Sequence, residues 1–199
     1  MDCPEIGRVV GSTDQVEYLV QVHGAGEVQQ PPSPRDYAFG RFVQISVDPA
    51  SRLIGVIYTT QLLNPAYGTL GPRLSTEQEL PVFSPDYLLE TAIVVGVTVL
   101  GSAQAIGPDQ IYDQHTPRLA ATVDAPCVLL PEPDELAFHR AGGRVRLGYF
   151  PRLLARPFPA LPDLLCSILD RLIVAFPEEK SQLMVARQNI LWRATIQGR

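Results

Sequence analysis

The sequence predicts a mainly β fold that ends in α-helices. Its 19 prolines and 15 glycines are spread along the chain rather than gathered in one tract. That spread suits short strands joined by turns, because proline removes a backbone donor and glycine supplies unusual dihedrals. Several short segments alternate apolar and polar residues with the period of a half-buried strand. After Phe150 the apolar residues instead recur every three or four positions, which predicts helices.

Bulk composition sets the class of protein. Of the 199 residues 46% are apolar and 19% are charged, so the chain can bury a core and wholesale disorder is excluded. The net charge is −5, and an acidic protein repels phosphate backbones at long range. We therefore expect any contact with nucleic acid to be weak or indirect.

The strands are predicted by alternation between turn-forming groups. Tyr18, Val20 and Val22 alternate with polar neighbours, and the turn Asp48–Ser51 separates two further alternating segments that predict a hairpin. The expected strands are Glu5–Val10, Glu17–Val22, Phe42–Val47, Arg52–Thr60, Thr91–Leu100, Arg118–Val123, Cys127–Leu130 and Arg144–Tyr149.

Between the strands we expect loops at His23–Pro34, at Leu62–Pro85 and at Gln104–Pro117. The last of these is the most polar loop of the chain, and it is predicted either to be plain surface or to contact a ligand or partner. A short helix is expected to begin near Glu132.

Two helices are expected to close the chain as a hairpin. One wide apolar stripe runs from Leu161 to Phe176, and Pro177 ends that helix and begins the next. The second helix, Glu178–Ile196, has a thinner stripe, with Met184, Leu191 and Trp192 to one side of it. The expected division is a β domain over residues 1–150 and a helical appendage over 151–199.

The sequence favours neither a cofactor nor a metal. It lacks the glycine-rich phosphate loop that ends in Gly-Lys, since its single lysine follows two glutamates. The three histidines have no metal-ligand spacing and are interpreted as solvated loop residues: His23, His115 and His139. The three cysteines lie far apart, which disfavours a disulfide framework or a zinc site, and the latter two are interpreted as packed apolar groups: Cys3, Cys127 and Cys166.

No set of residues predicts catalysis. The acidic group Glu132, Asp134 and Glu135 is interpreted as a solvated helix cap, because general acid–base work would need a partner on another element. We expect no catalytic residues. The N-terminus has no apolar signal segment, and the apolar run Thr91–Ala103 is shorter than the ~20 residues that cross a bilayer. The protein is therefore expected to be cytoplasmic and to make no contact with a membrane.

A group of arginines is the candidate nucleic-acid site. They fall within seventeen residues, with Tyr149 and Phe150 among them: Arg140, Arg144, Arg146, Arg152 and Arg156. Such a group is typical of a strip that holds phosphates and stacks bases. Two of the arginines also alternate with Val145 and Leu147, as on the outer face of any half-exposed strand, so a structural or protein-interface role is favoured over contact with nucleic acid.

The first part of the chain resembles a known family. Ile6–Thr13 and Glu17–Val22, then Phe39–Ile45 and Arg52–Ile57, resemble the opening strands of the HAS-barrel, the small N-terminal barrel of HerA-type DNA-translocating ATPases and of ATP synthase α and β subunits. The resemblance covers roughly Glu5–Tyr149. It implies a small, closed antiparallel β-barrel of the six-stranded type, which serves assembly and contact with partners rather than catalysis. The chain departs from the family after Phe150, where helices stand in place of the ATPase domain.

Three functions follow as expectations. We favour a non-catalytic protein-interaction and assembly adaptor that acts beside a separately encoded HerA-like ATPase or nuclease and can form a homo-oligomer. The second is a module that binds single-stranded nucleic acid through the barrel and the arginine group. The third is a ligand-binding barrel or enzyme that uses the barrel mouth and the Gln104–Pro117 loop, and a deep pocket with converging carboxylates or histidines would favour it.

Overall fold

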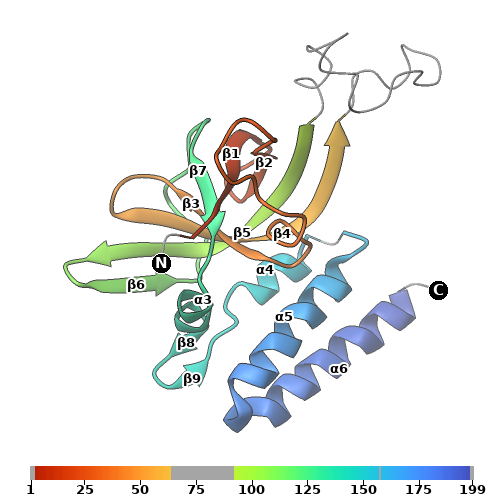
Figure 1. Ribbon diagram of the computed structural model, residues 1–199. Coiled ribbons are helices and arrows are strands. Elements are labelled where there is room, and N and C mark those ends of the chain that lie inside the picture. The colour runs from red at the N-terminus through yellow and green to blue at the C-terminus, as the bar shows by residue number, and fades with distance from the viewer. Residues whose placement is uncertain (1–2, 64–91, 157, 198–199) are drawn as a thin grey trace, which may run out of the picture.

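The fold is known from a computed structural model, which describes residues 3–63, 92–156 and 158–197. Six strands form a closed ring in which every neighbouring pair is antiparallel (Figure 1). In order around the ring they are β1 (Glu5–Ser12), β2 (Glu17–Val22), β5 (Ala92–Ile106), β4 (Ser51–Leu63), β3 (Phe42–Ser46) and β7 (Pro126–Leu129), which pairs back with β1. The prediction of a closed six-stranded antiparallel barrel is confirmed.

A seventh strand corrects the predicted loop Gln104–Pro117. β5 continues to Ile106, and β6 (Asp109–Asp113) pairs with it as a hairpin beside the barrel. Gly107 turns the chain at a φ of 61°, a left-handed conformation that suits glycine. The polar loop is therefore a β-hairpin for most of its length, and only the turn 107–108 and residues 114–117 lie outside strands.

Three other expectations need correction. Arg118–Val123 is not a strand, because no neighbouring strand pairs with it and Val123 is 67% exposed. The strand expected at Arg144–Tyr149 is reduced to β9 (Arg144–Val145), paired with β8 (Arg140–Ala141), and the chain then enters a short helix that was not predicted, α4 (Phe150–Leu154). β4 (Ser51–Leu63) includes the first two residues of the loop expected at Leu62–Pro85, and the rest of that expected loop lies outside the described residues.

The barrel interior is filled by alternate residues of its strands. Examples on β2 and β5 are Val20 and Val97, both fully buried. One extra residue, Leu100, sits where the pairing of β4 with β5 shifts, and this bulge turns its side chain out of the interior into a second core. The next residue, Gly101, has no room for a side chain, because a Cβ there would lie 2.0 Å from the carbonyl oxygen of Asp113.

The second core lies between the outer barrel wall and the helices α3 (Glu132–Phe138), α4 and α5 (Leu161–Ala175). The stripe of α5 faces Phe42 and Ile54 of the barrel wall, so this helix docks on the barrel. After η1 (Pro177–Glu179), α6 (Lys180–Gln197) packs back along α5 and lies farther from the barrel (Figure 1). The helical hairpin is confirmed. No helix among the described residues is long and apolar enough to cross a membrane.

Candidate functional site

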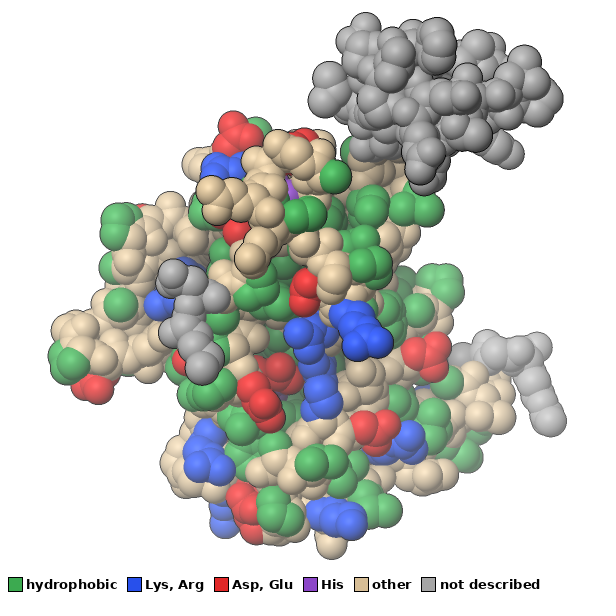
Figure 2. Space-filling view, in the orientation of Figure 1, with side chains coloured by type: hydrophobic (Ala, Val, Ile, Leu, Met, Phe, Trp, Pro, Cys, Tyr) green, Lys and Arg blue, Asp and Glu red, His purple; other side chains and the backbone are tan. Residues whose placement is uncertain are grey.

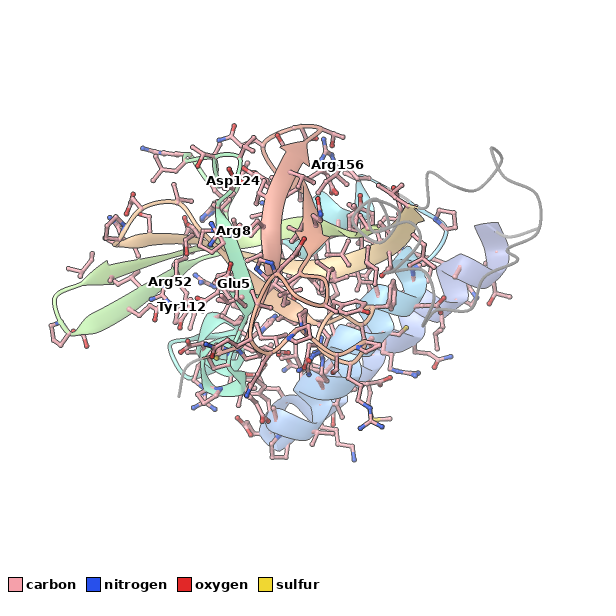
Figure 3. The ribbon with its side chains drawn as sticks, turned by 45° about the horizontal axis from the view of Figure 1, so that its top comes forward. Glu5, Arg8, Arg52, Tyr112, Asp124 and Arg156 are labelled. Atoms are coloured by element: carbon pink, nitrogen blue, oxygen red, sulfur yellow. The ribbon has the colours of Figure 1, made fainter. Side chains whose placement is uncertain are left out.

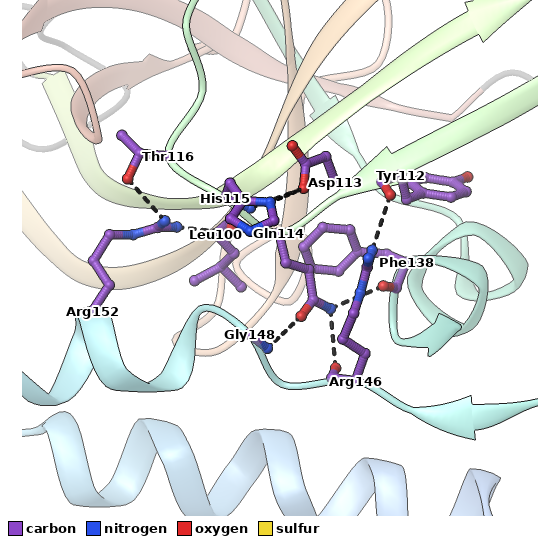
Figure 4. Close-up of polar contacts among 10 residues, drawn as sticks. All are labelled: Leu100, Tyr112, Asp113, Gln114, His115, Thr116, Phe138, Arg146, Gly148 and Arg152. Atoms are coloured by element: carbon purple, nitrogen blue, oxygen red, sulfur yellow. Dashed lines mark hydrogen bonds and ion pairs between the residues drawn. The ribbon is translucent and has the colours of Figure 1, made fainter. Parts of the chain in front are cut away.

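Three of the five candidate arginines make internal hydrogen bonds or ion pairs. Arg146 donates from Nη2 to the carbonyl oxygen of Tyr112 at 2.9 Å, on the outer edge of β6 (Figure 4). Arg152, on α4, donates to the carbonyl oxygens of Leu100 at 2.8 Å and Val99 at 3.1 Å. Arg156 forms an ion pair with Asp14, far from Tyr112 in Figure 3.

The other two arginines lie on the small β8–β9 hairpin. The Arg140 guanidinium carbon lies 5.0 Å from the centre of the Phe176 ring, a cation–π contact, and Arg144 is exposed. The aromatic Tyr149 is fully buried, so it has no face for a base to stack on. Basic and acidic side chains are interspersed on the face shown in Figure 2. The five arginines thus do not form one continuous strip, and nucleic-acid contact through Arg140 or Arg144 stays a prediction.

Gln114 joins three parts of the structure from a buried position. Its amide nitrogen donates to the carbonyl oxygens of Phe138 at 2.9 Å and Arg146 at 3.0 Å, and its oxygen accepts from the Gly148 amide at 2.6 Å (Figure 4). With both ends of the amide satisfied, the side chain fixes the end of β6 against α3 and the connection to α4. This network is structural.

His139 is fully buried, which corrects the expectation of a solvated loop. Its Nδ1 lies 2.7 Å from the carbonyl oxygen of Glu135, so Nδ1 carries the proton, and Nε2 accepts from the Tyr149 hydroxyl at 2.7 Å. Burial lowers the His139 pKa to about 4, so the ring is neutral at pH 7.

His23 is also largely buried, beside Glu5 at 3.1 Å, whereas the side chain of His115 is 89% exposed as expected.

The acidic group on α3 is only partly solvated. The Glu135 side chain is 13% exposed and lies 3.5 Å from Arg171 of α5. Burial raises the Glu135 pKa even though this guanidinium opposes the shift. Glu135 is therefore part of the contact between α3 and α5 rather than a solvated cap.

The predicted packing of Cys127 is confirmed, since it is fully buried in the barrel and burial raises its pKa to about 12.

A cavity of about 450 Å³ lies where β4 and β5 meet the chain after β6. Its polar lining includes Ser51, Gln104, Asp113 and His115. Asp113 lies 2.6 Å from His115, but the two side chains are 53% and 89% exposed, so they pair with each other at the rim. The described residues hold no group of three or more potential metal ligands. Asp113 and His115 are therefore the carboxylate and the histidine among the residues that line this cavity, and they contact each other.

The exposed side of α6 is different in character. Leu183 is buried against α5, and Arg187 is held by Asp170 at 2.6 Å. On the opposite side three large apolar residues are 53–63% exposed: Val185, Trp192 and Ile196. At 100° per residue they share an arc of about 100° with three exposed polar residues that carry no charge. We call this set the α6 face: Ser181, Val185, Gln188, Asn189, Trp192 and Ile196.

Over residues 1–199 the chain matches the family described as domain of unknown function DUF8166. The chain belongs to this family. No curated protein matches the sequence.

In this DUF8166 protein the α6 face is therefore an exposed surface that combines large apolar residues with uncharged polar ones. The charged residues of α6 all lie outside its arc: Lys180, Arg187 and Arg193. A solvated helix normally carries charge on its outer side, whereas protein interfaces are poor in charge at their centre and rich in tryptophan. The sequence placed Trp192 beside the thin stripe of its helix, but the position of α5 was needed to show which side is exposed.

Proposed function

We propose that this DUF8166 protein is a non-catalytic adaptor that binds protein partners through the α6 face. The observation that carries the proposal is the uncharged outer side of α6, on which Trp192 is 62% exposed. Exposed apolar area costs free energy in water, and tryptophan is the residue most enriched where interfaces gain their affinity. An amphipathic helix of a partner fits such a surface, because helix pairs pack apolar stripes together.

The barrel supports this role because its six strands pair with one another in a closed ring. Beside the ring β6 is an edge strand, and Arg146 already donates to the carbonyl oxygen of Tyr112 there. Addition of a partner strand along β6 would have to displace this guanidinium. A helical contact through α6 requires no such displacement.

The partner that we propose is a separately encoded HerA-like DNA-translocating ATPase or nuclease. This part of the proposal rests on the resemblance to the HAS-barrel. Support comes from the segments that carry it, since Ile6–Thr13 and Glu17–Val22 lie in adjacent strands of a closed antiparallel barrel. The chain itself carries no phosphate loop, so translocation would belong to the partner.

Affinity capture with the full chain from its native host tests the proposal. The wild type is compared with Trp192→Asp and with the matched control Val123→Asp, which places the same charge on a residue 67% exposed in the loop before β7. We expect a P-loop ATPase or a nuclease to be captured by the wild type and the control and lost with Trp192→Asp. The captured protein is then purified and its affinity for the three chains measured. Equal affinity for all three would contradict the proposal.

A further inference from the structure

The cavity beside β4 and β5 continues the interior face of the barrel. Leu53, Ser102 and Asp113 pair across β4, β5 and β6, so their side chains lie in one row on the same face of the sheet. Ser51 and Gln104 pair with each other in the next row of that face. All five residues line the cavity, and Leu53 also belongs to the core inside the barrel. The cavity therefore lies at a mouth of the barrel.

The opposite wall of the cavity is the chain that follows β6, and contacts from two other segments hold it in place. Gln15 donates from Nε2 to the carbonyl oxygen of Pro117 at 2.7 Å. Arg152 donates from Nη1 to Oγ1 of Thr116 at 3.2 Å (Figure 4). The cavity volume of about 450 Å³ lies within the roughly 300–1,000 Å³ of small-molecule sites. Because both walls are held from outside, a ligand would have little of the protein to order on binding.

The lining offers one negative and one positive group to a ligand. Asp113 accepts from the His115 amide at 3.1 Å and from its ring Nδ1 at 2.6 Å, both at Oδ1, so among the described residues Oδ2 is unpaired. Arg118 is exposed, and its guanidinium has no partner among the described residues. The guanidinium of Arg52 is directed to the other face of β4, where it donates to Gln44 at 2.9 Å.

From this lining we infer that the cavity binds a small aliphatic zwitterion of the amino-acid class. Oδ2 of Asp113 holds the ammonium group and the Arg118 guanidinium holds the carboxylate, since hydrogen bonds between ionised groups are the strong ones. A ligand with a single charge leaves one of these two groups without a partner. The aliphatic part of the ligand packs on the apolar residues of the lining: Val47, Leu53, Pro117 and Leu119.

Other classes of ligand fit the same lining less well. No aromatic residue is among the described residues that line the cavity, so a base has no ring to stack on. A phosphate group would meet one guanidinium and also the carboxylate of Asp113. The inference is separate from the adaptor role, because no residue of the α6 face lines the cavity.

Titration of the isotope-labelled full chain with L-leucine, followed by amide chemical shifts, tests the inference. Two analogues each keep one charge, since isocaproate lacks the ammonium group and isoamylamine lacks the carboxylate. We expect L-leucine to shift the amides of Ser102 and Thr116 with a dissociation constant on the order of 1 mM. Each analogue should bind about 10-fold more weakly, because it loses one charged hydrogen bond.

Two arginine variants with the same loss of charge give a matched control. Arg118→Gln removes the guanidinium from the cavity, so it should weaken L-leucine about 10-fold and leave isoamylamine unchanged. Arg144→Gln, at an exposed arginine of β9 that does not line the cavity, should leave all three affinities unchanged. Asp113→Asn should weaken L-leucine and leave isocaproate unchanged. The amide spectrum of each variant shows whether it is folded.

Three results would overturn the inference. The first is an absence of shifts at the cavity amides up to roughly 20 mM L-leucine. The second is equal affinity for L-leucine and either analogue, because the lining then does not recognise both charges. The third is equal weakening by Arg118→Gln and Arg144→Gln, which would show attraction to basic surface in general. None of these results bears on partner capture through Trp192, so the adaptor role is tested separately.

Discussion

α5 and α6 are consecutive helices of one hairpin, yet they place their apolar residues in opposite ways. α5 has seven buried residues: Leu161, Leu164, Leu165, Cys166, Ile168, Leu169 and Leu172. On α6 only Leu183 is buried to that degree among the described side chains, while Val185, Trp192 and Ile196 remain exposed. The difference teaches that the buried stripe of α5 holds the fold together, whereas α6 contributes fewer residues to the core and leaves large apolar residues exposed, which we propose serve a contact outside the chain.

The largest loss of stability is expected from a substitution at a buried residue of α5. Leu169→Ala removes a fully buried side chain from the contact between α5 and the barrel and should lower the free energy of unfolding by about 3 kcal/mol. Urea denaturation measures the change. On the same helix Val174 is 82% exposed, so Val174→Ala should change that free energy by less than ~0.5 kcal/mol. Similar losses in both variants would contradict the assignment of faces on α5.

Stability should also fall in acid because of His139. Its folded pKa of about 4 lies below the ordinary value of 6.5, so between these two pH values the unfolded chain binds a proton that the folded chain does not. The free energy of unfolding should therefore decrease as the pH falls from about 6.5 to 4, by on the order of 3 kcal/mol. The raised pKa of Glu135 acts with the opposite sign, since the folded chain then binds a proton more readily than the unfolded one.

Two variants isolate the contribution of His139 to this decline in denaturation curves taken across this pH range. His139→Gln should be less stable at pH 7 but should lose much of the decline toward pH 4, because it cannot take up a proton. His115→Gln, at a side chain 89% exposed, should keep the wild-type decline. A decline in His139→Gln as steep as that of the wild type would show that other groups cause it.

A smaller effect is expected at the polar contact between α5 and the barrel. Arg171 donates to the carbonyl oxygen of Gly40 at 2.7 Å, lies 3.5 Å from Glu135 and stands over the Phe42 ring. Arg171→Met leaves Glu135 largely buried without its cation and should cost about 2 kcal/mol in urea denaturation.

The matched control for this arginine lies on α6. Arg187 pairs with Asp170 at the surface, so Arg187→Met should cost no more than ~1 kcal/mol. If Arg187→Met costs as much as Arg171→Met, the two helices do not differ in the way proposed here.

The smallest effect on stability is expected where the effect on binding is greatest. Trp192→Ala should change the free energy of unfolding by less than ~0.5 kcal/mol. The same variant should lose affinity for the captured partner. A loss of stability as large as that of Leu169→Ala would mean that the indole holds the fold rather than a partner.

The sequence was sufficient to predict those strands and helices in which one face is buried and the other is exposed. Alternation such as that of Tyr18 and Val20 identified barrel strands because one face of each is buried. β6 was missed because its hairpin extends beside the barrel, where Ile111 is 54% exposed and no clear apolar face forms. Arg118–Val123 was predicted wrongly because local alternation cannot reveal whether a pairing strand is present.

The candidate site was less predictable because it depends on contacts between distant segments. The neutral state of His139 depends on Phe42 and Tyr149, which fold around it from other elements. The arginines are close in sequence, but Arg146 and Arg156 bind partners far from one another. The exposed side of α6 became visible only once α5 had occupied the other side.

Photocrosslinking in the native host tests the central claim most directly. A benzophenone amino acid replaces Trp192 on the α6 face in one strain and Val123, in the loop before β7, in another. Crosslinked adducts should form from position 192 and should be absent from position 123. Adducts that form equally from both positions, or from position 123 alone, would show that the α6 face is not the surface through which this protein binds others.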